Sequence, residues 1–474
     1  MKFENKAMLI TYPNRMGANL ADLTRLLTGP LAKAFGGIHI LPFYYSSGDA
    51  GFAPYRYEVD PQFGTWADVE RLAQNHYLMF DFMVNHLSPK SPEFQDFVAH
   101  HRESKFADLF LSWDQFWPAG RPTKDDVDQI YKRKDKAPFM PVRFADGTTE
   151  KIWNTFGDQQ MDLDVRTETT MRFIKQNLKH LIQHGASIIR LDAFAYAVKK
   201  LGTSDFFVEP ETWHLLDRIK EMLTGTDVTL LPEIHENYTY NEKMHAHGYF
   251  SYDFVLPIIT LHALYSHKVK TLVDWFNQAD MHQFTTLDTH DGIGVVDGKD
   301  ILTDDELDYT VDQLYKVGAN VKRAYSSAKY HNLDIYQLNT TYYSATGNND
   351  AAYLCARALQ MFAPGIPQVY YVGLLAGKND TTLVEQTREG RDINRHFYTL
   401  DEVHAELRRP VVQKVLRLLE LRNSCAAFDL EGTITAVAVD DHTMQVTRMN
   451  QAKTARAILT ADLAQMRYTI EVKQ

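Results

Sequence analysis

The sequence is poor in cysteine and has no long apolar run. It contains two cysteines, Cys355 and Cys425, which is too few for a disulfide framework or a cysteine metal site. Cys355 lies in a helical pattern that favours a buried apolar role. No segment approaches the ~18 apolar residues of a membrane-spanning helix, and the first apolar run is too short for a signal peptide. We therefore expect a soluble protein of the reducing cytoplasm.

The chain also lacks a basic excess and low-complexity sequence. Its formal net charge of −11 disfavours nucleic acid and anionic membranes as partners. Glycine and proline number 24 and 17, well below the level of low-complexity chains, and no tandem repeat occurs. Hydrophobic residues make up 45% of the 474 residues. These values are those of an ordinary globular protein with a large core.

What the sequence does contain is a series of eight short apolar runs. Each is bounded by polar or turn residues, which predicts a buried strand. Helical patterns separate most of them, and this alternation predicts parallel β-α units. Eight such units predict a closed (β/α)8 TIM barrel. The runs are AMLITYP from Ala7, GIHILPF to Phe43, YLMFDFMVNH to His86, ASIIRLDAF through Asp192, VTLLPEIH to His235, YDFVLP to Pro257, FTTLDTHD to Asp291 and IPQVYYVG to Gly373.

Three parts of the chain depart from this alternation. Residues 87–166 hold aromatic residues and a charged run, YKRKDK, which predicts an inserted domain after the third strand. Residues 293–347 predict a smaller insertion after the seventh strand. Residues 428–474 contain alternating patterns such as TMQVTRMN and RYTIEV, which predict a small antiparallel β domain. The barrel is then expected to comprise residues 1–86, 167–292 and 348–427.

Polar residues occur at the predicted carboxyl ends of several strands. In such a barrel these ends form one rim, and the rim carries the active site. Three carboxylates from three different strands are therefore expected to converge there. The rim residues are Asn85 and His86 after the third strand, Asp192 on the fourth, Glu233 and His235 on the fifth, and His290 and Asp291 on the seventh.

Three acids on one rim suit the cleavage of a glycosidic bond. One carboxylic acid protonates the leaving oxygen, and one carboxylate attacks the anomeric carbon. The apolar flank LLP before Glu233 is compatible with an acid that keeps its proton. Arg190 is two residues from Asp192, on the same strand face, and is expected to keep Asp192 ionised as a nucleophile. Taken singly, each acid has the alternative of a turn or cap residue; only the conjunction favours carbohydrate chemistry.

Four segments resemble the signature regions of the α-amylase clan. They are DFMVNH from Asp81, RLDAF from Arg190, EIH at Glu233 and THD ending at Asp291, in the expected order. Further segments, including GGIHILPFYYSSGDAGFAP, YKRKDKAP, LDTHDGIGVVD, LDIYQLNTTYYSA and GRDINRHFY, resemble the sucrose phosphorylases of this clan, particularly those of lactic acid bacteria. The resemblance covers nearly the whole chain and weakens after about residue 430.

This resemblance implies a glycosyltransferase that converts sucrose and phosphate reversibly to α-glucose 1-phosphate and fructose. Asp192 would be the nucleophile that forms a β-glucosyl-enzyme, Glu233 the acid/base, and Asp291 the stabiliser of the transition state. Retention of configuration requires the first two carboxyl groups to lie ~5–5.5 Å apart. No metal and no organic cofactor is implied, and the expected partners are the four small molecules of the reaction.

The resemblance also assigns the two subsites. Arg190 and residues that bind hydroxyls or stack on the sugar ring would form the glucose side: Asp49, Phe52, His86, Phe156, His290, Asp334 and Arg391. The acceptor side would be formed by Gln160, Tyr196, His235 and Gln337, with Tyr131 and Arg133 as candidates for contacting phosphate. Without the resemblance, the two phenylalanines would be core residues and Lys132, Lys134 and Lys136 a solvated charged loop.

Other functions stay open at this point. A sucrose 6′-phosphate or glucosylglycerate phosphorylase would share the catalytic residues and differ in the loops at 131–139 and 333–340. A hydrolase or transglucosidase of the same clan would act on sucrose without phosphate. A catalytically inactive sugar-binding relative would normally lack one central acid, and all three are present here. Both a monomer and a homodimer are compatible with the sequence.

Overall fold

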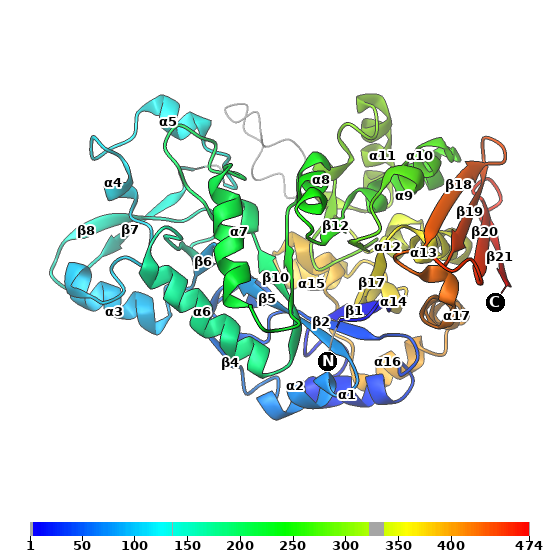
Figure 1. The fold of residues 1–474 in the computed structure, drawn as a ribbon, viewed down its shortest axis with the longest axis horizontal. Coiled ribbons are helices and arrows are strands. Elements are labelled where there is room, and N and C mark those ends of the chain that lie inside the picture. Colours follow the sequence, from blue (N-terminus) through cyan, green and yellow to red (C-terminus); the bar gives the residue numbers. More distant parts are fainter. Residues whose placement is uncertain (1–2, 135, 322–335, 474) are drawn as a thin grey trace.

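The computed structural model describes residues 3–134, 136–321 and 336–473. Its central sheet has eight strands in the order β11-β10-β5-β2-β1-β17-β13-β12, and every pairing within it is parallel. The sheet curls into a barrel (Figure 1), and each strand overlaps one of the eight predicted runs; β12 and β13 begin one residue before theirs. The strands are β1 Met8–Thr11, β2 Gly37–Ile40, β5 Tyr77–Met83, β10 Ala186–Asp192, β11 Thr229–Pro232, β12 Ser251–Asp253, β13 Gln283–Thr285 and β17 Ile366–Tyr370.

The strands are buried on both faces, as expected for a parallel sheet covered by helices. Every residue of β5 and β10 is buried. The helices pack their apolar stripes onto the outside, and α1 buries the four leucines Leu20, Leu23, Leu26 and Leu27. None of the helices in the described ranges is long and apolar enough to cross a membrane.

A series of helices follows the barrel strands along the chain. They are α1 Leu20–Thr28, α2 Trp66–Ala73, α6 Glu168–Gln183, α7 Glu211–Met222, α8 Thr239–Ala246, α9 Val255–Ser266, α10 Lys270–Gln278, α12 Tyr342–Ala345, α13 Asp350–Phe362, α14 Tyr371–Leu374, α15 Thr381–Thr387, α16 Leu400–Glu406 and α17 Pro410–Ser424. Gly185 follows α6 with φ +100°, the left-handed conformation that often ends a helix.

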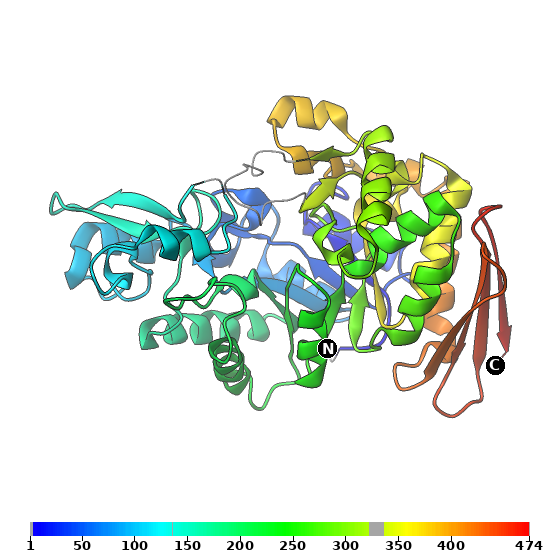
Figure 2. The ribbon, with the colours of Figure 1, turned by 90° about the horizontal axis from the view of Figure 1, so that it is seen from above.

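The segment between β5 and β10 projects from one end of the molecule (Figure 2). It has a small core of its own, in which Trp113, Phe116, Trp117 and Trp153 pack together. This arrangement agrees with an inserted domain, for which we keep the bounds 87–166 as a proposal. Its elements are β6 His86–Leu87, α3 Pro92–His100, α4 Trp113–Phe116, α5 Lys124–Gln129, and the strands β7 Phe139–Arg143, β8 Thr149–Trp153 and β9 Met161–Asp162. A separate hairpin, β3 Tyr44–Ser46 with β4 Pro54–Val59, precedes it.

Two further groups of strands lie outside the barrel. After β13, a three-stranded sheet joins β14 (Ile293–Gly294), β16 (Gln337–Asn339) and β15 (Asn320–Val321), with α11 (Asp304–Lys316) beside it. The C-terminal sheet is antiparallel and lies at the end of the molecule opposite to the inserted segment (Figures 1 and 2). Its strands are β18 Thr433–Ala438, β19 Thr443–Met449, β20 Arg456–Asp462 and β21 Arg467–Lys473. The bounds 293–347 and 428–474 remain proposals.

Candidate active site

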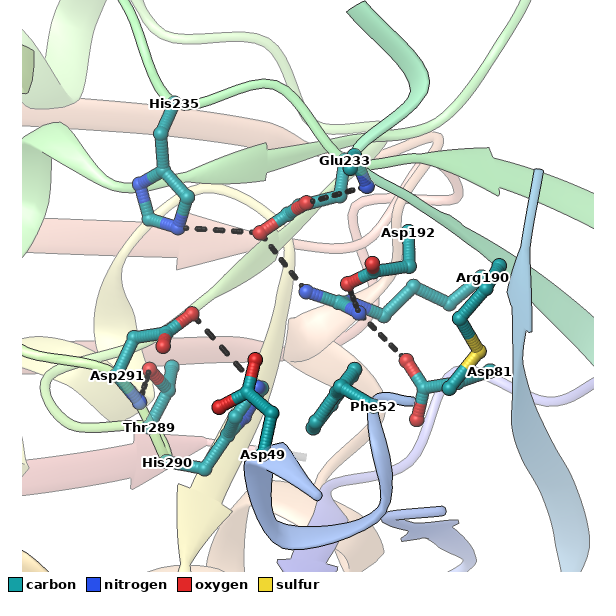
Figure 3. Close-up of polar contacts among 12 residues, drawn as sticks. Asp49, Phe52, Asp81, Arg190, Asp192, Glu233, His235, Thr289, His290 and Asp291 are labelled. Atoms are coloured by element: carbon teal, nitrogen blue, oxygen red, sulfur yellow. Dashed lines mark hydrogen bonds and ion pairs between the residues drawn. The ribbon is translucent and has the colours of Figure 1, made fainter. Parts of the chain in front are cut away.

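The carboxyl ends of the strands surround a cleft, and the three predicted acids line it. Asp192 is the last residue of β10, Glu233 directly follows β11, and Asp291 lies in the loop after β13. Figure 3 shows their carboxyl groups turned toward one shared space. One carboxylate oxygen each of Glu233 and Asp291 and one ring nitrogen of His235 lie within 4.8 Å of one another. The convergence that the sequence predicts is therefore present.

Arg190 lies below the cleft and joins its acids. Its Nη1 is 3.0 Å from Oδ1 of Asp192, and its Nη2 is 2.9 Å from Oε1 of Glu233. Nη1 also lies 2.5 Å from Oδ1 of Asp81, whose other oxygen is 2.8 Å from Nε2 of His39. Burial would raise the pKa of Asp81, but His39 and Arg190 lower it to about 2. Asp81 thus stays ionised and pairs with the guanidinium of Arg190 on the side away from the cleft.

The protonation of Asp192 differs from the expectation. Burial raises the pKa of its carboxyl group well above the ordinary value, Glu233 raises it further, and Arg190 lowers it without outweighing them. Arg190 divides its charge among three carboxylates, so it does not by itself keep Asp192 ionised. Asp192 therefore keeps its proton to higher pH than an ordinary aspartic acid, because burial and the neighbouring carboxylate both disfavour its charged form.

Glu233 is fixed by a backbone donor as well as by side chains. Its Oε2 accepts a hydrogen bond of 3.0 Å from the N–H of Ala193. Ala193 has φ +51°, a left-handed conformation that costs energy for a residue with a Cβ and that is often found at functional sites. On the other side, Nε2 of His235 lies 3.4 Å from Oε1 of Glu233. The strained turn after β10 therefore aims an N–H at the proposed acid/base.

Asp291 is held as a carboxylate. Nη1 of Arg391 lies 3.1 Å from its Oδ1. Burial would raise the pKa of Asp291, but Arg391, His290, His235 and Arg395 together lower it far below the ordinary value. A fixed negative charge therefore faces the cleft, which is what a cationic sugar transition state requires.

The group Glu233, His235 and Asp291 also has the spacing of a metal site. Each of its two carboxylates already pairs with a guanidinium, Arg190 on Glu233 and Arg391 on Asp291. Two such positive charges oppose the entry of a divalent cation. The spacing alone therefore does not indicate a metal site.

The residues predicted for the glucose side gather at one wall of the cleft. Asp49 lies 3.8 Å from Nη1 of Arg391. The rings of Phe52 and His290 stack with centroids 4.8 Å apart and planes 5° apart. Burial lowers the pKa of His290 to about 3, so this imidazole is neutral. Asp334, also predicted for this side, lies outside the described residues.

His86 and Gln160 belong to the same wall. Nε2 of His86 donates a 2.8 Å hydrogen bond to the carbonyl of Phe52, and burial lowers the pKa of His86. Nε2 of Gln160 lies 3.2 Å from His86 and 3.3 Å from Asp49. Gln160 thus contacts residues predicted for glucose rather than those predicted for the acceptor. The ring of Phe156 lies 5.7 Å from that of His86 and lines the cleft.

The opposite wall carries an arginine among aromatic rings. The guanidinium carbon of Arg133 lies 3.8 Å from the ring centre of Tyr336 and 5.7 Å from that of Tyr196. Arg133 forms no ion pair with a carboxylate in the described part of the chain. His235 and Gln337 line this part of the cleft as well. A guanidinium at this position suits an anionic acceptor, because it offers several N–H donors to phosphate oxygens.

Two predictions about the charged run YKRKDK need correction. Tyr131 does not line the cleft: its hydroxyl donates a 2.8 Å hydrogen bond to Glu236, and its ring stacks on Phe206. Lys132 and Lys134 are buried, with exposed fractions of 1% and 5%, so the alternative of a solvated loop fails for both. Lys136 is exposed, with 63% of its side chain accessible.

Comparisons with known proteins agree with this geometry. The α-amylase catalytic-domain family matches residues 34–414. The chain is 54% identical over 471 residues to sucrose phosphorylase from Streptococcus mutans, covering 99% of this chain and 98% of that one. The chain belongs to the sucrose phosphorylase family.

Two relatives with other names are more distant from this chain. It is 42% identical to glucosylglycerol phosphorylase from Marinobacter adhaerens, over 90% of this chain and 89% of that protein. The crystal structure of sucrose 6F-phosphate phosphorylase from Thermoanaerobacter thermosaccharolyticum matches with a TM-score of 0.94 at 40% identity, covering 100% of this chain and 97% of that one. The assignment of the fold and the family therefore rests on relatives that match this chain along almost its full length.

Four residues that line the cleft were not predicted: Ala193, Ala195, Ile234 and Tyr336. The first three are small or apolar neighbours of the catalytic segments and carry no chemical signal. Tyr336 precedes the predicted Gln337 in LDIYQ and could have been found as the aromatic partner of a cation. The sucrose phosphorylase resemblance named the polar members of the site and the rings of Phe52, Phe156 and Tyr196, but it missed Tyr336.

Proposed function

We propose that the protein is a sucrose phosphorylase, which converts sucrose and phosphate reversibly to α-glucose 1-phosphate and fructose. The observation that carries this proposal is the 54% identity to the sucrose phosphorylase of Streptococcus mutans over 99% of the chain, combined with three acids around one cleft. A cleft holding all three acids also argues against an inactive sugar-binding protein.

In the first step, the carboxylate of Asp192 would attack the anomeric carbon of the glucose unit. Glu233 would give its proton to the oxygen that leaves with fructose, and the bond between that oxygen and the anomeric carbon would break. Asp291 would stabilise the positive charge that develops on the sugar. The step needs Asp192 as a carboxylate and Glu233 as a carboxylic acid.

In the second step, phosphate would attack the β-glucosyl-enzyme and release Asp192. Phosphate is already an anion, so it needs less help from a base than water does, but it must approach a cleft lined with carboxylates. Arg133 has no carboxylate partner among the described residues and is the best candidate to receive it. His235 supports it: burial lowers the pKa of its ring, but Asp297 and the acids of the cleft raise it above its ordinary value overall.

The test is an incubation of the purified protein with sucrose, with and without phosphate. We expect glucose 1-phosphate in equal amount to fructose when phosphate is present, and little product without it. Release of free glucose at the same rate in both conditions would instead identify a hydrolase. Sucrose 6′-phosphate, glucosylglycerate and glucosylglycerol should be tested in parallel. If one of them reacts faster than sucrose, that compound becomes the proposed donor in place of sucrose.

The partners that we propose are the small molecules of this reaction alone. A cytoplasmic location also remains a proposal, and both cysteines are free and buried, which fits a reducing compartment. Whether the protein is a monomer or a homodimer is a question for light scattering.

A further inference from the structure

Asp297 is a buried acid that no step of the reaction above uses. It lies in the 3-10 turn η4 (Val296–Gly298) after β14, and its exposed fraction is 2%. Its Oδ2 lies 3.4 Å from Nδ1 of His235, on the side of the ring that faces away from Glu233. Burying a carboxylate is costly unless a charged or hydrogen-bonding partner faces it, and His235 is that partner.

A glycine makes room for this carboxylate. A Cβ added to Gly294 would lie 1.7 Å from Oδ2 of Asp297, far inside contact distance. The backbone at Gly294 cannot easily retreat, because Gly294 pairs with Gln337 in the sheet of β14 and β16. Any side chain at this position would therefore push the carboxylate of Asp297 away from His235.

The ring of His235 is held in one orientation. It stacks on Phe254, with centroids 3.7 Å apart and planes 14° apart. Nδ1 faces Asp297. Nε2 points toward Glu233, as Figure 3 shows. Nε2 is buried and makes no hydrogen bond to any described residue. The carboxylate oxygen of Glu233 at 3.4 Å makes a long ion pair with Nε2 rather than a hydrogen bond, so Nε2 can still donate to a group that enters the cleft.

We propose that Asp297 is a positioning residue, which holds His235 with an N–H on both ring nitrogens so that Nε2 presents a positive edge to the phosphate acceptor. This inference rests on the proposed phosphorolysis. Once Glu233 has given its proton to the departing fructose, the carboxylates of Glu233 and Asp291 both repel phosphate. The positive charge of His235 would offset that repulsion, because charges interact more strongly in a protein interior than in water.

The groups around the ring support a charged imidazole. Burial is the largest single influence on the pKa of His235 and lowers it; among the groups that raise it, Asp297 comes first, and Glu233 and Asp291 follow. Of the nearby bases, Arg190 is charged and His290 is neutral. The charged and titratable groups around the ring are Asp297, Glu233, Asp291, Arg190, His290, Tyr252 and Tyr336.

The first experiment replaces Asp297 by Asn, which keeps the shape and removes the charge. The measurement is the ratio of glucose 1-phosphate to free glucose formed from sucrose at a phosphate concentration below saturation. Both products come from the same glucosyl-enzyme, so a loss of folded protein or of the first step leaves this ratio unchanged. We expect the ratio to fall, and KM for phosphate to rise, by about tenfold, the change produced by 1.4 kcal/mol of lost interaction.

Asp300→Asn is the matched control. Asp300 is three residues further along the same loop, is exposed, and accepts a hydrogen bond from the side chain of Asn237. The chemical change is identical, but its carboxylate does not face His235. We expect an unchanged product ratio in this variant. An equal fall in both variants would overturn the inference, because it would assign the effect to the loop rather than to Asp297.

Gly294→Ala tests the same contact without removing the acid. The added Cβ displaces the carboxylate of Asp297, so the product ratio should fall as it does in Asp297→Asn. If Asp297→Asn does not fold, this variant decides the question. An unchanged ratio in Gly294→Ala, or in a folded Asp297→Asn, would overturn the inference.

A second readout does not depend on the reaction. The ring nitrogens of ¹⁵N-labelled histidine are followed by NMR as pH changes, and the signal of His235 is identified by its loss in His235→Gln. We expect the pKa of His235 to be lower by about one pH unit in Asp297→Asn. If the wild type releases only glucose from sucrose, the proposed function fails, yet this titration still decides whether Asp297 positions His235: an unchanged pKa overturns it.

Discussion

Arg391 and Asp291 form an ion pair at the wall of the cleft, with Nη1 of the arginine 3.1 Å from Oδ1 of the acid. Arg391 is the first of the cations that lower the pKa of this buried carboxyl group against the effect of burial. The pair is asymmetric, because the side chain of Arg391 is 32% exposed and that of Asp291 is 12% exposed. Solvent can therefore reach the cation while the anion stays inside.

Replacing Arg391 by Gln should make the enzyme sensitive to acid. Asp291 acts as an anion, and without Arg391 its pKa rises toward the working range. The acid limb of kcat/KM for sucrose should then move to higher pH, and kcat/KM at neutral pH should fall by about 10²–10³-fold, as when one positioned charge is lost from an active site. Arg391→Lys keeps the charge and should keep the acid limb. An acid limb that does not move in Arg391→Gln would contradict this role.

Replacing Glu233 by Gln should distinguish the acid role of Glu233 from the nucleophile role of Asp192. Sucrose needs a proton on its leaving oxygen, so its turnover should fall by about 10²–10⁴-fold. α-Glucosyl fluoride needs little protonation and should still glucosylate Asp192. Because Glu233 raises the pKa of Asp192, its neutralisation should also move the acid limb of the fluoride reaction to lower pH. Equal losses with both donors would rule out the acid role of Glu233.

The barrel was predictable because each strand is a short buried run that ends at polar residues. The ends of the strands were less predictable. The run FTTLDTHD predicts a strand that continues to Asp288, but β13 ends at Thr285. Asp288 instead turns inward, where Nη2 of Arg357 lies 2.8 Å from both of its oxygens. Arg357 is 69 residues further along the chain, and no local pattern reveals this partner.

The same limit applies to the site. Asp192, Glu233 and Asp291 were predictable because strand ends meet at one rim. His39 was not, since it lies in the interior of the apolar run GIHILPF and becomes informative only when Asp81 is seen beside it. Asp297 was passed over for the same reason, because its partner His235 precedes it by 62 residues. Residue pairs that meet only in the folded chain cannot be recognised from their spacing in the sequence.

Replacing Asp81 by Asn should destabilise the protein more than any surface charge change. Asp81 is fully buried between His39 and Arg190, and its loss leaves the positive charge of Arg190 less compensated. Removing one partner of a buried ion pair costs about 3–5 kcal/mol. Urea unfolding should show this decrease. Asp274→Asn breaks the exposed pair with Lys270 and should stay within about 1 kcal/mol of the wild type; similar effects of both variants would contradict the assignment.

Replacing Asp192 by Asn should abolish activity and stabilise the protein near neutral pH. The folded-state pKa of Asp192 is raised, mainly by burial and by Glu233. The stability linked to its proton is therefore full below the unfolded pKa and is lost as pH rises through the folded pKa. Asn carries no charge and escapes that loss, so Tm at neutral pH should rise by about 2–4 °C. The gain should vanish at pH below about 4; a gain that is equal at both pH values would point to packing instead.

Replacing Arg133 by Gln should weaken the binding of phosphate more than the binding of sucrose. The guanidinium lies over Tyr336 at the cleft and forms no ion pair with a carboxylate in the described residues, so its N–H groups are candidates to meet an anion. We expect KM for phosphate to rise by about 10–10²-fold, as for the loss of a charge-assisted hydrogen bond, with KM for sucrose changed far less. Arg133→Lys keeps the charge but loses the paired donors and should be intermediate. In the double variant Arg133→Gln with His235→Gln, KM for phosphate should rise further. If phosphate affinity were unchanged in the double variant, neither residue would supply the charge that admits the anion, and the acceptor would have to enter by another wall of the cleft.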